Sequence, residues 1–97
     1  MARLPRIVIP DVSLHLTQRG NRREWTFFED GDYQLYLDLL ADATRQARCE
    51  IWSYCLMPNH AHIVIVSSDE DGLWRTFRAL HRHYTGYINA RMRMTGH

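Results

Sequence analysis

The sequence predicts an α+β domain in which an antiparallel sheet packs against two helices. Alternating apolar and polar residues at 12–19 are typical of a half-buried strand. Residues 50–57 predict a second strand with Ile51 and Ser53 on one face, and the β-branched stretch 60–66 predicts a third. Apolar residues spaced by three and four after Tyr33 and after Leu73 predict two amphipathic helices. The order strand, helix, strand, strand, helix begins a ferredoxin-like βαββαβ unit, and we expect its last strand to be missing from these residues.

Turn and cap signals predict where these elements begin and end. The first strand ends at the Gly-Asn pair at 20–21, and the Pro-Asn pair at 58–59 joins the next two strands into a tight hairpin. Asp30 or Asp32 is expected to cap the first helix, which would then run for about four turns. Gly86 falls inside the second helix and should weaken it by about 1 kcal/mol relative to alanine.

Length and composition restrict the class of protein. The 97 residues suffice for a single domain, 1–97, and the 45% of hydrophobic residues indicate a folded core. No apolar run approaches the roughly 20 residues needed to cross a bilayer. The first residues lack the apolar stretch of a secretory signal, so we expect a cytoplasmic protein with no membrane contact. Cys49 and Cys55 do not follow a metal-ligand spacing and are expected to be reduced thiols.

The net charge of +1 conceals a segregation of charge along the chain. All 12 basic residues are arginines: residues 1–23 hold five of them and one acid, and residues 72–97 hold five and no acid. Residues 24–71, between these two segments, hold ten acids and only two arginines. Because the guanidinium group suits phosphate, this distribution is compatible with a nucleic-acid partner. A solvated helix face or an arginine-rich codon bias would produce the same pattern.

Two histidines on one predicted strand form the candidate site. His60 and His62 lie two residues apart just after a turn, so their side chains should share a face while Ala61 points toward the core. Two imidazoles placed in this way can bind one divalent metal ion at about 2.1 Å each. The alternative is a pair of ordinary strand histidines that face solvent.

The residues around these histidines resemble a known family. The segment Cys-Leu-Met-Pro-Asn-His-Ala-His at 55–62 is similar to the His-hydrophobic-His (HUH) motif of the insertion-sequence (IS200-like) and REP-associated tyrosine transposases. Three further segments match this family in the expected order, namely 16–23, 83–89 and 93–97. Several ordered segments are more specific than one pair of histidines. The resemblance identifies residues 1–97 as the N-terminal portion of such a protein.

The resemblance implies an enzyme that cleaves and rejoins single-stranded DNA. In this family two histidines, here His60 and His62, hold Mg²⁺ or Mn²⁺ together with a third polar ligand. The metal ion polarises the scissile phosphate, and a tyrosine attacks it to form a phosphotyrosine intermediate. Members of the family recognise hairpin DNA and usually act as dimers.

The nucleophilic tyrosine of the family is expected to lie outside these residues, in a later helix. Tyr84 and Tyr87 are the remaining candidates, but both fall on the apolar stripe of the second helix and are better explained as packing residues. The third metal ligand of the family also tends to come from the tyrosine helix, and His15 on the first strand is a substitute candidate. We therefore expect this chain alone to bind metal weakly and to lack cleavage activity.

Arginine-rich segments supply the candidate DNA contacts, which would position DNA through its phosphates. For each of these residues a solvated surface position is the alternative. An unpaired sheet edge and an aromatic surface at Trp25, Phe27 and Phe28 favour a homodimer. The candidate DNA contacts are Arg19, Asn21, Arg22, Arg23, Arg75, Arg78 and Arg82.

Two other functions remain open. A non-catalytic module could bind structured single-stranded DNA or RNA through aromatic side chains and arginines. It would be indifferent to Mn²⁺ and to the substitution His60→Ala. A folded but inactive remnant of a transposase is the other alternative.

Overall fold

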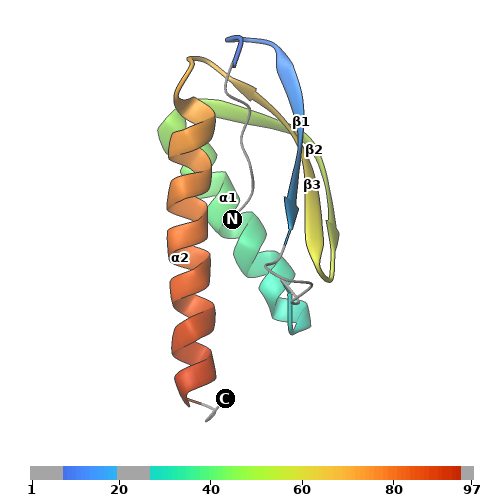
Figure 1. Ribbon diagram of the computed structural model, residues 1–97, viewed down its shortest axis with the longest axis vertical. Coiled ribbons are helices and arrows are strands. Elements are labelled where there is room, and N and C mark those ends of the chain that lie inside the picture. The colour runs from blue at the N-terminus through green and yellow to red at the C-terminus, as the bar shows by residue number, and fades with distance from the viewer. Residues whose placement is uncertain (1–7, 20–26, 95–97) are drawn as a thin grey trace.

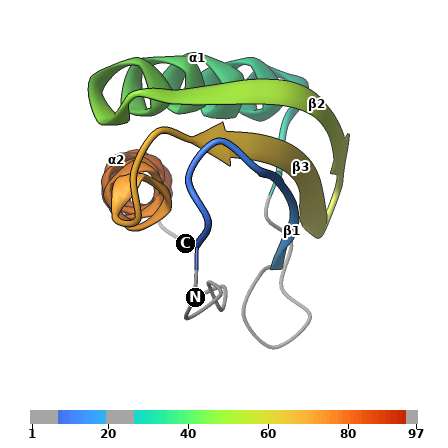
Figure 2. The same ribbon diagram turned by 90° about the horizontal axis from the view of Figure 1, so that it is seen from above.

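A computed structural model describes residues 8–19 and 27–94 of the chain. The described elements follow the predicted order of strand, helix, strand, strand and helix, so the α+β class is confirmed. Figure 1 shows the helices next to each other with the strands on one side of them, and Figure 2 shows α1 running beside β2. The elements are β1 (Ser13–Arg19), α1 (Asp30–Ala47), β2 (Cys49–Met57), β3 (His60–Ser67) and α2 (Gly72–Met94).

The sheet is antiparallel with the strand order β1-β3-β2. The hairpin therefore places β3 in the centre, and β1 pairs with its other edge. Successive residues of β3 point to opposite faces, and one of these faces is covered by the helices. The fully buried residues on that face are Ala61, Ile63 and Ile65.

A bulge interrupts β2. Ile51 stands opposite Ile65 and Ser53 opposite Val64, so Trp52 is an extra residue between them. Ile51 consequently faces the core side, whereas the unbroken alternation predicted for 50–57 had placed it on the same face as Ser53. The bulge leaves the Trp52 side chain 63% exposed.

An aromatic cluster fills the core where α1 begins. Phe27 is 2% exposed and stacks on Tyr33 with ring centroids 4.4 Å apart, and it makes edge contacts with Tyr36 and Tyr84. The expectation of an exposed aromatic surface at this position is wrong for Phe27, because the ring packs between the two helices. Phe28 is exposed, and Trp25 lies outside the described residues.

The start of α1 is set by a cap at Glu29 rather than at Asp30 or Asp32. The Asp32 carboxylate reaches back and accepts hydrogen bonds from the backbone N–H groups of Phe28 and Glu29. The Glu29 N–H is one of the donors that the first turn of a helix leaves unpaired. Asp32 thus acts from inside the helix. Arg48 follows the helix in a left-handed conformation with φ 58°, which ends α1 after 18 residues.

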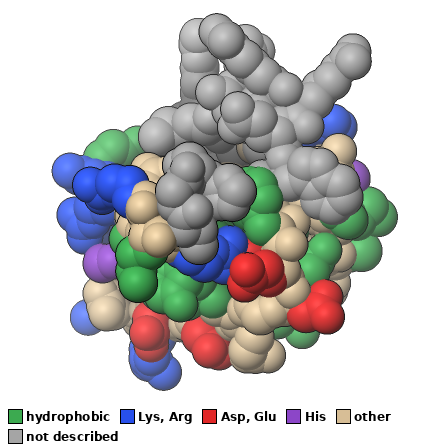
Figure 3. Space-filling view, turned by 90° about the horizontal axis from the view of Figure 1, so that it is seen from below, with side chains coloured by type: hydrophobic (Ala, Val, Ile, Leu, Met, Phe, Trp, Pro, Cys, Tyr) green, Lys and Arg blue, Asp and Glu red, His purple; other side chains and the backbone are tan. Residues whose placement is uncertain are grey.

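An ion pair joins the start of α1 to the end of α2. Arg91 of α2 donates to both carboxylate oxygens of Asp32, at 2.6 and 3.1 Å, and one of its nitrogens lies 3.3 Å from Glu29. Figure 3 looks at this end from below and shows arginine and acidic side chains side by side.

Among the described helices, none is long and apolar enough to span a membrane.

Candidate metal centre

The candidate site lies on the face of the sheet opposite the helices. We call this surface the histidine face. In the register, Thr17 of β1 and Cys55 of β2 both stand opposite His62 of β3, so the three side chains share this face. Its members are His15, Thr17 and Arg19 of β1, Ser53, Cys55 and Met57 of β2, and His60, His62 and Val64 of β3.

The two candidate ligands lie side by side at the start of β3. The rings of His60 and His62 have centroids 4.9 Å apart and are nearly perpendicular to each other. Both side chains are partly exposed, while Ala61 between them is completely buried and anchors the strand in the core. The structure therefore brings together the pair that the spacing predicted to share a face.

Each histidine ring also contacts a neighbouring polar group. The Nδ1 atom of His60 lies 2.6 Å from Oδ1 of Asn59 in the hairpin turn. The Nδ1 atom of His62 lies 3.3 Å from Oγ1 of Thr17 and 3.2 Å from Nε2 of His15. These contacts restrict the orientation of both rings before any metal ion is bound. Asn59 and Thr17 were not predicted as site residues.

The electrostatics of the face favour neutral histidine. Partial burial lowers the pKa of His62, and the nearby His60, His15 and Arg19 lower it further. Only the neutral ring has a lone pair for a metal ion, so a lowered pKa keeps His62 able to ligate over a wider pH range.

The donors on this face fit part of a metal site. His60 and His62 could supply two neutral imidazoles to a divalent metal ion, and imidazole suits Mn²⁺ better than the strictly oxygen-seeking Mg²⁺. Within residues 8–19 and 27–94, no three His, Cys, Asp or Glu side chains are placed to hold a metal ion together. His15 lies beside His62 as its strand position suggested, and its role as the third ligand stays a prediction.

No tyrosine shares the histidine face. Tyr84 is buried against Phe27 and Tyr36, and burial raises the pKa of its phenol. Tyr87 is exposed, but it lies on α2. Tyr54 stands opposite Ile63 and thus belongs to the side of the sheet that faces the helices. All five tyrosines of the chain are on helices or on that side: Tyr33, Tyr36, Tyr54, Tyr84 and Tyr87.

The described residues that were predicted to contact DNA lie in different parts of the structure. Arg19 ends β1 opposite His60 and so belongs to the histidine face. Arg78 stacks over the ring of Trp74 at 4.8 Å, and together with Arg82 these side chains line a shallow pocket on the outside of α2. Asn21, Arg22 and Arg23 lie outside the described residues.

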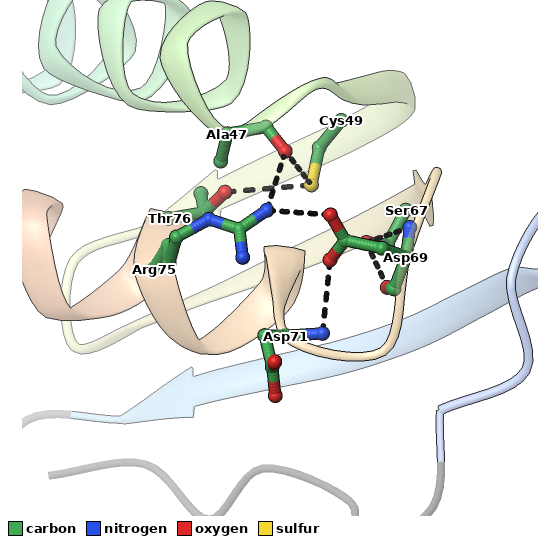
Figure 4. Close-up of polar contacts among 7 residues, drawn as sticks. All are labelled: Ala47, Cys49, Ser67, Asp69, Asp71, Arg75 and Thr76. Carbon is green, nitrogen blue, oxygen red and sulfur yellow. Dashed lines mark hydrogen bonds and ion pairs between the residues drawn. The ribbon is translucent and has the colours of Figure 1, made fainter.

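Arg75 has a structural contact that the helical spacing did not reveal. Its guanidinium donates to Asp69 at 2.7 Å and to the backbone carbonyl of Ala47 at 3.3 Å, as Figure 4 shows. Next to it, Thr76 lies 3.5 Å from the buried Sγ of Cys49. These contacts join the end of α1 to the start of α2, so a phosphate group would have to compete with Asp69 for Arg75.

Comparison with known proteins identifies the class. Residues 8–96 match the family described as "Transposase IS200 like". The chain therefore belongs to the IS200-like transposase family, and the resemblance inferred from its motifs is confirmed. A search of curated proteins finds no match.

The fold is similar to a solved structure of a REP-associated tyrosine transposase bound to a REP hairpin, with a TM-score of 0.69 and 22% sequence identity. The match covers 92% of this chain and 54% of that transposase, so the chain spans about half its length. At this level of identity the likeness supports the fold. It shows that a three-stranded sheet and two helices in this arrangement occur within about half of that transposase.

Proposed function

We propose that this chain is the histidine-bearing portion of a transposase that cleaves and rejoins single-stranded DNA with the help of a divalent metal ion. The observation that carries the proposal is the pair His60 and His62, side by side on an open sheet face within a chain of the IS200-like family. A metal ion bound there would polarise the scissile phosphate.

The chain's own residues have three tasks in this proposal. His60 and His62 hold the metal ion, and Mn²⁺ suits their nitrogens better than Mg²⁺. Arg19, next to His60 on the same face, is suited to a DNA phosphate beside the metal ion. A tyrosine from outside these residues attacks the phosphate, which forms a 5′-phosphotyrosyl link and releases the 3′-hydroxyl of the cleaved strand. The nucleophile is assigned to other residues because the tyrosines present here do not share the histidine face.

The proposed substrate is hairpin DNA, since the structurally similar transposase was solved with a REP hairpin. Trp74 and Arg78 offer a stacking surface with a guanidinium group above it, and Arg82 lies in the same pocket. Such an arrangement suits an unpaired base and the neighbouring phosphates.

Metal binding tests the role of the histidines. Mn²⁺ titrated into the protein and followed by calorimetry should bind, and His60→Ala and His62→Ala should each weaken the affinity by more than about tenfold. His83→Ala is the matched control, because this exposed histidine lies on α2 away from the face. Equal affinities for all four proteins would contradict the assignment.

Activity tests the place of the nucleophile. Incubated with single-stranded hairpin DNA and Mn²⁺, the chain should form no covalent protein–DNA adduct visible in a denaturing gel. An adduct that disappears with Tyr84→Phe or Tyr87→Phe would overturn the proposal.

The pocket on α2 supports a second candidate, a module that binds structured single-stranded DNA or RNA without cleaving it. The stacked pair Trp74 and Arg78 could act independently of the histidines. Binding of hairpin DNA that is unaffected by Mn²⁺ and by His60→Ala would favour this candidate. A dependence on both would favour the transposase.

A further inference from the structure

The contacts made by the Nδ1 atoms of His60 and His62 lead to an inference that rests on the proposed metal site. We propose that Asn59 and Thr17 are positioning residues that hold both rings with the proton on Nδ1 and thereby present their Nε2 atoms to the metal ion. His15 then acts as a hydrogen-bond partner of His62 and does not supply the third ligand.

Asn59 determines the tautomer of His60. Its Oδ1 atom lies 2.6 Å from Nδ1 of His60, and an amide oxygen can only accept a hydrogen bond. The Nδ1 atom must therefore carry the proton, and the lone pair of the neutral ring is on Nε2. Because Asn59 directly precedes the strand, the same turn that closes the hairpin orients the first ligand.

Thr17 and His15 act on His62 from the neighbouring strand. Thr17 stands directly opposite His62, and its hydroxyl lies 3.3 Å from Nδ1. The Nε2 atom of His15 lies 3.2 Å from the same nitrogen. In the proposed arrangement both groups accept a hydrogen bond from the same Nδ1–H, as a three-centre bond, and the lone pair of His62 is on Nε2. A ligating histidine usually has its second nitrogen held in this way by a neighbouring group.

This assignment excludes His15 as a ligand through that nitrogen. An unprotonated ring nitrogen has one lone pair, so the Nε2 atom of His15 cannot bind a metal ion while it accepts a hydrogen bond from His62. The competing arrangement would place a metal ion between His15 Nε2 and His62 Nδ1. The two arrangements use opposite nitrogens of His62 and can be distinguished by experiment.

The first test is a long-range ¹H–¹⁵N NMR spectrum of the metal-free protein at neutral pH. We expect the pattern of a protonated Nδ1 and an unprotonated Nε2 for both His60 and His62. On titration with diamagnetic Zn²⁺, the Nε2 signals of these two rings should shift, and those of His15 should not show direct coordination. Protonated Nε2 atoms in the metal-free protein, or coordination through Nδ1 of His62, would overturn the proposal.

The second test uses variants that remove or keep the polar group. Thr17→Val and Asn59→Ala should each weaken Mn²⁺ binding by about tenfold, while Thr17→Ser and Asn59→Asp, which retain an acceptor oxygen, should bind nearly as wild type. His15→Gln should also keep most of the affinity, because its amide oxygen can still accept from Nδ1–H. A loss with His15→Gln as large as that with His62→Ala would identify His15 as a ligand.

Two controls keep the outcomes separate. His83→Gln should leave both the spectrum and the affinity unchanged, and circular dichroism reports whether each variant is folded. If a Thr17 variant does not fold, the tautomers of the wild-type protein still decide the question. Absence of Mn²⁺ binding in the wild type would count against the proposed function, whereas the tautomers of the metal-free protein test the hydrogen bonds alone.

Discussion

Asp32 performs two structural tasks with one buried carboxylate. It accepts hydrogen bonds from the backbone at the start of α1, and it pairs with Arg91 from the end of α2. Its side chain is 3% exposed and that of Arg91 is 21% exposed, so water screens the pair poorly. A buried charge is tolerated only when it is paired and hydrogen-bonded, as it is here.

Removal of the Asp32 charge should therefore destabilise the protein strongly. We expect Asp32→Asn to lower the free energy of unfolding by about 3 kcal/mol, because Arg91 is left without its main partner. Urea denaturation measures this change. Asp38→Asn is the matched control, since Asp38 is an exposed acid of the same helix and should cost less than about 0.5 kcal/mol. Equal effects of the two substitutions would contradict the role given to Asp32.

The same pair predicts a dependence of stability on pH. The hydrogen bond from Arg91 lowers the pKa of Asp32 below its usual value of 3.8, and the N–H groups of Phe28 and Glu29 lower it further against the effect of burial. A lowered folded-state pKa means that this stabilisation is complete above the unfolded-state pKa and is lost as the pH falls through the folded-state value. The stability difference between wild type and Asp32→Asn should thus shrink below about pH 4. A constant difference from pH 7 to pH 2 would contradict this explanation.

At the scale of the elements, two glycines of α2 should respond oppositely to the same substitution. A Cβ atom at Gly86 would meet nothing within 4 Å, whereas one at Gly72 would lie 2.2 Å from Oγ of Ser67. We expect Gly86→Ala to raise the free energy of unfolding by about 1 kcal/mol through its helix propensity. Gly72→Ala should lower it, because the start of α2 would have to move away from β3. Thermal unfolding compares both variants, and destabilisation by Gly86→Ala would contradict this reading.

The elements were predictable because their signals are local. Alternation and the spacing of apolar residues gave the five elements in order, and the spacing of His60 and His62 placed them on one face. The bulge at Trp52 depends instead on how β2 pairs with β3, which no local pattern of 50–57 reveals. The cap of α1 differed from the prediction because Asp32 lies three residues after the N-cap Glu29, and its carboxylate reaches back to the Glu29 N–H.

The surroundings of the site were less predictable than its ligands. The contact of Thr17 with His62 depends on the register between β1 and β3, whose paired residues are far apart in the sequence. Arg75 has the helical spacing of a surface arginine, and only the folded chain brings Asp69 and the end of α1 to it. Tertiary contacts of this kind have no signature in a single segment.

At the scale of the whole molecule, the sheet order leaves β2 as an edge strand within the described part of the chain. Its side chains Trp52 and Tyr54 are 63% and 54% exposed. An edge strand with exposed aromatic side chains favours pairing with another chain. This strand is a better candidate for the proposed homodimer contact than Phe27, which is buried.

The proposed dimer can be tested through this edge. We expect light scattering to show an increase of mass with concentration, and the double substitution Trp52→Lys with Tyr54→Lys to suppress it, because charge on an edge strand opposes pairing. Trp74→Lys, a change of an equally exposed aromatic residue on α2, should leave association unchanged. A monomer at high concentration, or loss of association with Trp74→Lys alone, would count against this contact.

Figure 1 shows that α2 extends well beyond the strands, and its 23 residues would span about 35 Å of the 44 Å long axis. Its first half is fixed by Leu73, Phe77 and Leu80, which are at most 2% exposed, while past Ile88 the helix is held through Arg91 and the partly buried Met92. Amide protons in the two halves should therefore exchange with deuterium by different routes. Exchange of the amide protons in the first half requires global unfolding, whereas exchange near Arg91 requires only local fraying of the helix end. We expect Asp32→Asn to accelerate exchange selectively near Arg91.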